Sequence, residues 1–358
     1  MQSLLMVCVM VGLAKAQSSV EVEWTWGPVL PTAQSAVGTV AIGRDIVIVG
    51  GTYWVNSRDG VPTKIWSDKV WKLNTETMKW TSLRDYPLPL GYPLVVADTK
   101  RIWVIGGASE KRTHSKIHVL DVSQTNADWK PGPPLPVPRM GGKGGIADGM
   151  IYVAAGTELR ETQSTPAMDL LRLDTRNLKH GWQHVSNIPG PHIEWRSGTI
   201  SDGTLYLFGG LVTPDPVVPR SPDKVVRATH NMATLTPRSE SCAFNIASHR
   251  WKNLRPLPVP MGSGGCTGID DHRILITGGL ALAIAKNRLS DHKIRTYLSN
   301  ECLLYDTKKD QYETLTSSLR LSVLDHGSAI IGGTVYVIGG EDSTWKTRTD
   351  LVQIGQLR

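Results

Sequence analysis

The 358-residue sequence predicts an all-β fold made of six repeated sheets. Six times a short apolar strand runs into a pair of small residues, in the segments Ile46–Gly51, Ile102–Gly107, Ile151–Gly156, Leu205–Gly210, Ile274–Gly279 and Val335–Gly340. The pairs end at positions 51, 107, 156, 210, 279 and 340, so the repeat period runs from 49 to 69 residues. Repeats of about this length stack around an axis, and radial repetition lets one domain use the whole chain without a second core. We therefore expect a single six-bladed β-propeller.

The first repeat indicates the order of strands within one unit. A loop follows its glycine pair, and in segment 68–74 the apolar residues alternate as in a half-buried strand. Trp80 follows on a short fourth strand, and the proline-rich segment 87–89 leads into the next repeat. Later repeats place an aromatic residue at the same point, namely Trp129, Trp182, Trp251 and Tyr312. Each repeat is thus predicted to be a four-stranded sheet with a large apolar side chain for packing against its neighbour.

The sixth repeat lacks a fourth strand at its own end. It finishes with a third strand over 350–354, close to the last residue of the sequence. Segment 20–31 contains Trp24 and Trp26 followed by two prolines, which is the pattern of a fourth strand without the first three. We expect this N-terminal strand to complete the last blade, because closing the ring removes an exposed sheet edge.

The first sixteen residues predict a secretory signal peptide. Segment 4–13 is apolar and too short to span a bilayer, and Ala14-Lys15-Ala16 has the small residues of a cleavage site. No Lys or Arg precedes the apolar run. We expect cleavage before Gln17, a secreted or periplasmic protein, and one propeller domain over residues 17–358.

Cysteine usage and charge narrow the classes of function. Once Cys8 is removed with the signal, Cys242, Cys266 and Cys302 remain, and no CxxC pair occurs. This argues against a disulfide framework and a structural zinc site, so we expect buried thiols. Lys and Arg total 39 against 32 for Asp and Glu, which favours anionic partners. The basic residues are scattered, without a nucleic-acid-binding signature, and an acidic small molecule or glycan is the better candidate.

Familiar catalytic motifs do not occur in the sequence. It contains no G-x-S-x-G nucleophile elbow. The segment Gly141-Gly142-Lys143-Gly144-Gly145 is glycine-rich, but no helical pattern follows it as a dinucleotide site would require, and it opens an inner strand. We expect no metal and no organic cofactor.

A glycine pair followed by an aromatic residue late in each four-stranded unit resembles the kelch repeat, over essentially the whole mature chain. The resemblance implies that the loops after the glycine pairs and the connections from each fourth strand to the next first strand share one end of the ring. We call this end the mouth, and we expect function there. Two long inserts, 211–239 and 280–297, belong to it. The first is proline-rich and either semi-rigid or disordered, and the second carries a basic run that either holds a carboxylate or sulfate or is a hydrated loop.

The last repeat carries a sharper resemblance. Its sequence Gly339-Gly340-Glu341, followed by Arg348-Thr349, is similar to the active-site blade of the sialic acid mutarotases, also called N-acetylneuraminate epimerases. Some members of that secreted kelch family have a cyclically permuted blade order. The resemblance implies that Glu341 is the general base on the anomeric hydroxyl and that Arg348 pairs with the substrate carboxylate. The spacer between them holds Trp345 here, is longer than in the family and lacks its Pro-Gly pair.

Two hypotheses follow for the function. The first is an enzyme that interconverts the anomers of an acidic sugar, with Glu341 and Arg348 as catalytic residues. Other mouth residues are candidates for binding the substrate, namely Arg160, Glu194, Arg196, Arg288 and Arg295. Glu194 with Arg196, and Glu158 with Arg160, are rival Glu/Arg pairs. The second hypothesis is a non-catalytic kelch module that binds a glycan or a protein, because propellers support both kinds of function.

Overall fold

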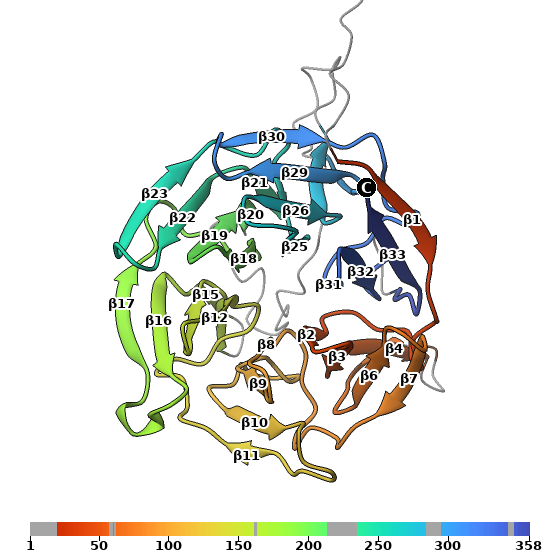
Figure 1. Cartoon of the computed structure of the whole chain (residues 1–358), viewed down its shortest axis with the longest axis vertical. Helices are drawn as coiled ribbons and strands as arrows, with labels where there is room; N and C mark the ends of the chain where they lie inside the picture. The colour runs from red at the N-terminus through yellow and green to blue at the C-terminus, as the bar shows by residue number, and fades with distance from the viewer. Residues whose placement is uncertain are drawn as a thin grey trace, which may run out of the picture.

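The computed structural model describes residues 20–56, 60, 62–160, 163–212, 235–283, 295–342 and 347–358. Within these residues, six four-stranded antiparallel sheets are arranged as blades around a central axis (Figure 1). This confirms the predicted β-propeller. The predicted signal peptide, residues 1–16, lies outside the described residues, and no helix within them is long and apolar enough to cross a bilayer.

The blades follow one another in chain order, and each is given from its inner to its outer strand. Blade 1 is β2 (Gly38–Ile42), β3 (Asp45–Val49), β6 (Val70–Asn74) and β7 (Lys79–Ser82). Blade 2 is β8 (Leu94–Ala97), β9 (Arg101–Ile105), β10 (Ile117–Asp121) and β11 (Lys130–Pro131). Blade 3 is β12 (Lys143–Ala147), β13 (Met150–Ala154), β16 (Asp169–Asp174) and β17 (Gln183–Asn187), with the short 3-10 helix η1 (Leu178–His180) before β17.

The second half of the ring repeats the pattern. Blade 4 is β18 (Ser197–Ser201), β19 (Thr204–Phe208), β22 (Ser241–Asn245) and β23 (Arg250–Leu254). Blade 5 is β25 (Gly265–Gly268), β26 (Arg273–Thr277), β29 (Cys302–Asp306) and β30 (Gln311–Thr314). Blade 6 is β31 (Gly327–Ile331), β32 (Thr334–Ile338), β33 (Val352–Leu357) and β1 (Val22–Trp26).

The N-terminal strand closes the ring. Strand β1 pairs antiparallel with β33, Val22 opposite Leu357 and Trp26 opposite Gln353, and Figure 1 shows β1 outermost on blade 6. Each inner strand also contacts the inner strands of both neighbouring blades. The predicted closure by segment 20–31 is therefore confirmed.

The apolar core is divided among the contacts between blades. On the second strand of each blade the side chains are buried on both faces, as at Ile46, Val47, Ile48 and Val49. Between blades 6 and 1, for example, Ile46 and Ile48 of β3 pack with Ile338 of β32. Because every blade buries apolar surface only against its two neighbours, the ring depends on every such contact.

The glycine pairs let each blade approach the next one closely. Gly50 and Gly51 have φ of +66° and +114°, and the Gly51 N–H donates to the carbonyl of Leu90, in the connection to the next blade, at 2.8 Å. A Cβ on Gly50 would lie 2.4 Å from that carbonyl oxygen. Both the conformation and the space therefore require glycine.

In blades 1 to 5 the late aromatic residue is hydrogen-bonded to the preceding blade. The Trp80 indole N–H donates to the carbonyl of Pro28 at 3.0 Å, and that of Trp182 donates to the carbonyl of Pro133 at 2.9 Å. In blade 5 the Tyr312 hydroxyl donates to the carbonyl of Arg255 at 3.0 Å. The predicted packing role of these aromatic residues thus includes a hydrogen bond between blades.

The segments after the glycine pairs form second hairpins at the mouth. In blade 1 the predicted loop is wrong, because β4 (Thr52–Asn56) and β5 (Pro62–Trp66) pair there. The other extensions are β14 (Thr157–Arg160) with β15 (Gln163–Pro166), β20 (Gly210–Val212) with β21 (Thr236–Arg238), and β24 (Met261–Gly262) with β27 (Leu280–Ala283) and β28 (Arg295–Leu298). The two long inserts are thus ordered at their ends, and their middle parts, 213–234 and 284–294, lie outside the described residues.

The three remaining cysteines are free thiols. Cys242 and Cys302 are buried at similar places on the third strands of blades 4 and 5, as expected. Cys266 is half-buried on the inner strand β25.

Candidate functional site

A ring of six residues surrounds the axis at the mouth, one from each connection between blades. These residues are Ala36, Tyr92, Gly141, Trp195, Ser263 and Asp325, and their φ values lie between +50° and +66°. Five backbone hydrogen bonds of 2.7 to 3.0 Å link them in order from Trp195 around to Gly141. Left-handed backbone is unfavourable for the residues other than glycine, so the closed arrangement of blades has to hold it. We call this set the mouth ring.

The mouth ring and the residues that follow it enclose a cavity of about 70 Å³. Its charged lining comes from Lys143 of β12, Arg196 just before β18, and Asp325. Tyr92, Trp195 and other members of the ring supply the rest of the wall. The cavity is therefore partly aromatic and charged, and its volume suits one polar group of a ligand, because sites that enclose a whole small molecule are several times larger.

Glu341 and Arg348 meet beside this cavity. Glu341 follows the last glycine pair, and its backbone pairs with Leu324, the residue before Asp325, through hydrogen bonds of 2.9 and 3.1 Å. Arg348 Nη2 lies 2.8 Å from Glu341 Oε1, and their side chains are only 5% and 13% exposed. Arg348 Nη1 also donates to the carbonyl of Thr347 at 2.7 Å. The structure thus brings the two predicted catalytic residues together in a buried ion pair.

Lys64 from the second hairpin of blade 1 joins the same cluster. Its Nζ donates to the Tyr92 hydroxyl at 3.2 Å and lies 4.8 Å from the ring centroid of Trp66 and 5.2 Å from that of Tyr92. Burial and the nearby Arg348 guanidinium lower the pKa of Lys64 to about 8, against the opposing charges of Glu341 and Asp325. Lys64 can therefore gain or lose a proton near neutral pH.

Burial also shifts the carboxyl groups of the site. It raises the pKa of Glu341 to about 7, and nearby Asp325 and Asp342 add to the effect, while Arg348 and Lys64 oppose it. Burial raises the pKa of Asp325 as well, against Lys143, Arg348 and a hydrogen bond from Ser263. Two carboxyl groups and one lysine with pKa values displaced toward neutrality thus lie at or beside one cavity, a pattern that is enriched at functional sites.

His326 is neutral in this setting. Burial and the Lys143 charge lower its pKa to about 4. Its Nε2 lies 3.2 Å from the Thr277 hydroxyl oxygen. At neutral pH His326 therefore adds no positive charge to the cavity wall.

The other predicted residues have different positions. Glu194 and Arg196 are both buried, and the Glu194 backbone pairs with Leu211 as that of Leu324 pairs with Glu341, so Glu194 takes the place of Leu324 in its repeat. Arg196 Nη1 donates to the carbonyl of Glu240 at 3.1 Å and lines the cavity, and burial lowers its pKa. Arg160 ends β14 and Arg295 begins β28, but the side chains of both, and the whole of Arg288, lie outside the described residues.

Sequence reasoning missed Lys64, Tyr92 and Lys143. Tyr92 takes the same place in its connection that Asp325 takes in the last one, so aligning the six connections by repeat would have placed it on the mouth ring. Lys64 has no such signal, because its hairpin was expected to be a loop. Trp345, in the spacer between the catalytic candidates, lies outside the described residues.

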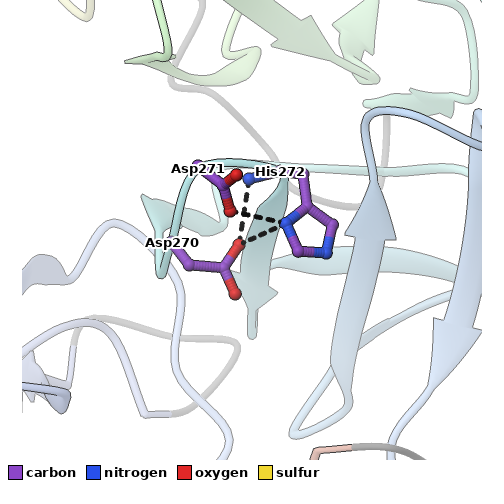
Figure 2. A group of neighbouring side chains, drawn as sticks. All are labelled: Asp270, Asp271 and His272. Atoms are coloured by element: carbon purple, nitrogen blue, oxygen red, sulfur yellow. Dashed lines mark hydrogen bonds and ion pairs between the residues drawn. The ribbon is translucent and has the colours of Figure 1, made fainter.

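A compact group of Asp270, Asp271 and His272 lies in the turn between β25 and β26, at the end opposite the mouth (Figure 2). Asp270 accepts backbone N–H bonds from His272 and Arg273 at 3.0 and 2.7 Å. His272 Nδ1 lies 2.6 Å from Asp271 Oδ1, and Lys308 Nζ is 3.2 Å from Asp271 Oδ2. Asp98 caps the matching turn of blade 2 in the same way. These interactions stabilise the turn, and they explain why the three side chains lie together.

Comparisons with known proteins found distant relatives of this chain. No protein-family profile matches the chain. It is 21% identical over 230 residues to N-acetylneuraminate epimerase 1 of Escherichia coli, covering 58% of this chain and 55% of that protein. It is 24% identical over 233 residues to the N-acetylneuraminate epimerase of Yersinia pestis, covering 57% and 54%. The chain therefore spans about half the length of the curated relatives it matches.

Two further matches concern the repeat and the fold. Kelch-like protein 40 of Xenopus tropicalis is 24% identical over 269 residues, which is 72% of this chain and 36% of that protein. The solved structure of YjhT superposes with a TM-score of 0.68 at 15% identity, covering 93% of this chain and 99% of that one. At this identity the superposition supports the fold alone. The chain is a kelch-repeat β-propeller with distant homology to the N-acetylneuraminate epimerases.

Proposed function

We propose that this protein is a mutarotase of an acidic sugar, similar to a sialic acid epimerase, that works at the mouth without a metal or an organic cofactor. The observation that carries the proposal is the buried pair of Glu341 and Arg348, 2.8 Å apart beside the cavity, with the pKa of Glu341 raised to about 7. The resemblance to N-acetylneuraminate epimerases supports the substrate class.

The proposed reaction moves one proton off the sugar and another onto it. The Glu341 carboxylate takes the proton of the anomeric hydroxyl, and the Lys64 ammonium, hydrogen-bonded to Tyr92, gives a proton to the ring oxygen as the bond from that oxygen to the anomeric carbon breaks. The resulting open-chain ketone rotates about its adjacent carbon–carbon bond. Ring closure on the other face reverses both transfers, so that Glu341 and Lys64 return to their starting states.

Arg348 is the guanidinium that the resemblance assigns to the substrate carboxylate. Its fork of N–H donors matches a carboxylate in two parallel hydrogen bonds. Its present bond to Glu341 also stabilises the ionised form of that base. Arg196, Glu194, Arg160, Arg288 and Arg295 remain candidates for further contacts with the substrate.

The test is anomer equilibration of freshly dissolved α-N-acetylneuraminic acid, followed by proton NMR. We expect the wild-type protein to accelerate it and Glu341→Gln to lose ~10²-fold or more of the enzyme-dependent rate. Glu76→Gln is the matched control, because Glu76 is exposed in the turn between β6 and β7, at the end opposite the mouth. Activity unchanged in Glu341→Gln would remove Glu341 from the mechanism, and no acceleration by the wild type would remove the proposed reaction.

The alternative is a kelch module that binds a glycan or a protein without catalysis. The match to Kelch-like protein 40, which extends over more of this chain than the epimerase matches, favours it. Saturable binding on a glycan array, together with no acceleration of mutarotation, would identify the protein as a binding module.

We also propose that residues 1–16 are removed and that the protein is secreted or periplasmic, on the basis of the apolar segment 4–13 and the Ala-Lys-Ala sequence that follows it. Mass spectrometry of the protein from its native host should give an N-terminus at Gln17. A mature chain that begins at Met1 would contradict this proposal.

A further inference from the structure

The glycine-rich segment 141–145 places a single long side chain, that of Lys143, in the cavity wall. Gly141 belongs to the mouth ring with a φ of +66°, and a Cβ on Gly144 would lie 1.9 Å from the carbonyl oxygen of Tyr152. The lack of space therefore requires glycine at position 144, whereas the other mouth-ring positions carry residues other than glycine at a φ similar to that of Gly141. The segment presents a lone ammonium to the axis of the propeller.

In the described part of the chain the Lys143 ammonium has no hydrogen bond or ion pair, although Asp325 is near enough to attract its charge. The surrounding protein lowers the pKa of Lys143 by burial. Lys143 is half-buried, and a cation that opens on a cavity with no ion-pair partner among the described residues can receive an anion there.

Arg196 lies across the junction of blades 3 and 4 from Lys143. Lys143 is the first residue of β12, and Arg196 immediately precedes β18. These two inner strands are in contact, and both residues line the cavity. Arg196 uses Nη1 on the carbonyl of Glu240, which is a neutral acceptor. His326 also lines the cavity but is uncharged at neutral pH. Among the described lining residues, the cations are therefore Lys143 and Arg196, and the carboxyl group is that of Asp325.

Arg348 already has a bond on each terminal nitrogen, and its buried Nε has no partner among the described residues. Its Nη2 is engaged by Glu341 and its Nη1 by the carbonyl of Thr347. A carboxylate placed against it would also lie beside the Glu341 carboxylate, and two like charges at such a distance repel. Lys143 and Arg196 share the cavity with Asp325, but burial raises the pKa of that carboxyl group and so favours its uncharged form, which does not repel an anion.

We propose that Lys143 and Arg196 form an anion-binding subsite that holds the carboxylate of the acidic sugar, and that Arg348 instead positions Glu341. The identification of the ligand as an acidic sugar rests on the proposed function. The subsite differs from what the resemblance implies, which gives the carboxylate to Arg348. The sugar ring would then lie between the base of the cavity and the cluster of Glu341, Lys64 and Tyr92.

The first test compares affinities for N-acetylneuraminate and its uncharged methyl ester by isothermal titration calorimetry. We expect the wild type to prefer the acid by ~10-fold or more, since charge-assisted hydrogen bonds are the strong ones. Lys143→Gln should abolish most of that preference, and Lys143→Arg should keep it. Lys72→Gln is the matched control, because Lys72 lies on β6 and pairs with Asp45, away from the mouth, and it should behave as the wild type.

Two results of this comparison would overturn the subsite. One is an undiminished preference for the acid in Lys143→Gln. The other is a preference lost in Arg348→Lys and kept in Lys143→Gln, which would return the carboxylate to Arg348.

A second measurement uses the folded wild-type protein labelled with [ε-¹³C]lysine. The NMR signal of Lys143, assigned by its loss in Lys143→Arg, should shift saturably when N-acetylneuraminate or sulfate is added. A shift with sulfate in a protein that neither binds nor equilibrates the sugar would support the subsite and reject the proposed function. A Lys143 signal that responds to neither anion would reject the subsite, whatever the mutarotation assay gives.

Discussion

Glu341 has the setting of a base that works near neutral pH. An exposed glutamate loses its proton far below pH 7 and is a weak base, whereas burial brings the pKa of Glu341 to about 7. The charges that face it come from four places, with Asp325 and Asp342 raising its pKa and Arg348 and Lys64 lowering it. Lys64 in turn faces Arg348, Glu341 and Asp325, and its pKa is about 8. The base and the acid of the proposed reaction are therefore matched to the same narrow range of pH.

This match predicts a bell-shaped dependence of the enzyme-dependent mutarotation rate on pH. The rate should rise as Glu341 loses its proton around pH 7 and fall as Lys64 loses its own around pH 8. Lys64→Met should lower the maximum by ~10²-fold or more and remove the falling limb. The measurement is the initial rate by proton NMR with the buffer rate subtracted, and a falling limb that survives in Lys64→Met would exclude Lys64 as the acid.

The sequence located some residues of the site and not others, for physical reasons. Glu341 and Arg348 were predicted because their places follow from a glycine pair and the motif behind it. Lys64 was missed because only the three-dimensional fold brings strand β5 of the second hairpin of blade 1 close to Glu341 and Arg348. Lys143 was noticed within a glycine-rich segment, but the segment was compared with phosphate-binding loops and not with the lining of an axial cavity.

The glycine pair is the element that fixes the spacing between blades. Gly339 and Gly340 hold the end of β32 against the connection after β1, where the Gly340 N–H donates to the carbonyl of Gln34 at 2.9 Å. Glu341 comes next in the chain, so the element that joins two blades also aims the catalytic candidate at the axis. The glycine pair of blade 1 has the same geometry, so the effect of a side chain at such a pair on stability can be tested without changing the candidate site.

We predict that Gly50→Ala is far more destabilising than Gly43→Ala. Both glycines have a positive φ, +66° and +59°, but a Cβ would clash with the carbonyl oxygen of Leu90 at 2.4 Å in the first case and meet nothing within 4 Å in the second. Gly43→Ala should cost about 1 kcal/mol for the left-handed backbone alone, and Gly50→Ala about 3 kcal/mol or more. Urea unfolding measures both, and equal losses would show that only the backbone conformation matters.

The strands of the blades were predictable, and the second hairpins at the mouth were not. Strands such as β3 and β32 are short apolar runs that end at a glycine pair, which is a strong local signal. In β4 and β5, by contrast, polar and apolar residues are mixed, and the two strands are stabilised by packing over the mouth, where Trp66 lies against the apolar cluster of Ala108 and Trp195. Contacts between distant blades cannot be read from such a segment alone.

At the scale of the whole molecule, the N-terminal strand is what makes the ring closed. Val20, Val22 and Trp24 are buried in the core between blades 5 and 6, with Val335 and Val337. Burying side chains of this size contributes about 1.5–3 kcal/mol each. Strand β1 also satisfies the backbone of β33, which would otherwise be an exposed edge.

A chain that begins at residue 32 should therefore lose much of its stability. We expect a melting temperature at least ~10 °C lower than that of residues 17–358, or aggregation through the exposed edge of β33. Differential scanning calorimetry with size-exclusion chromatography distinguishes these results. A monomeric truncated protein with the melting temperature of residues 17–358 would contradict the closure.

The central claim is that the mouth of this propeller catalyses mutarotation of an acidic sugar through Glu341. The most direct measurement is the first-order rate at which α-N-acetylneuraminic acid converts to its β-anomer, followed by proton NMR near pH 7.5 with wild type, Glu341→Gln and Glu76→Gln at equal concentrations. The account predicts acceleration by the wild type and by Glu76→Gln, and a rate close to that of buffer for Glu341→Gln. A wild-type rate equal to that of buffer would contradict it.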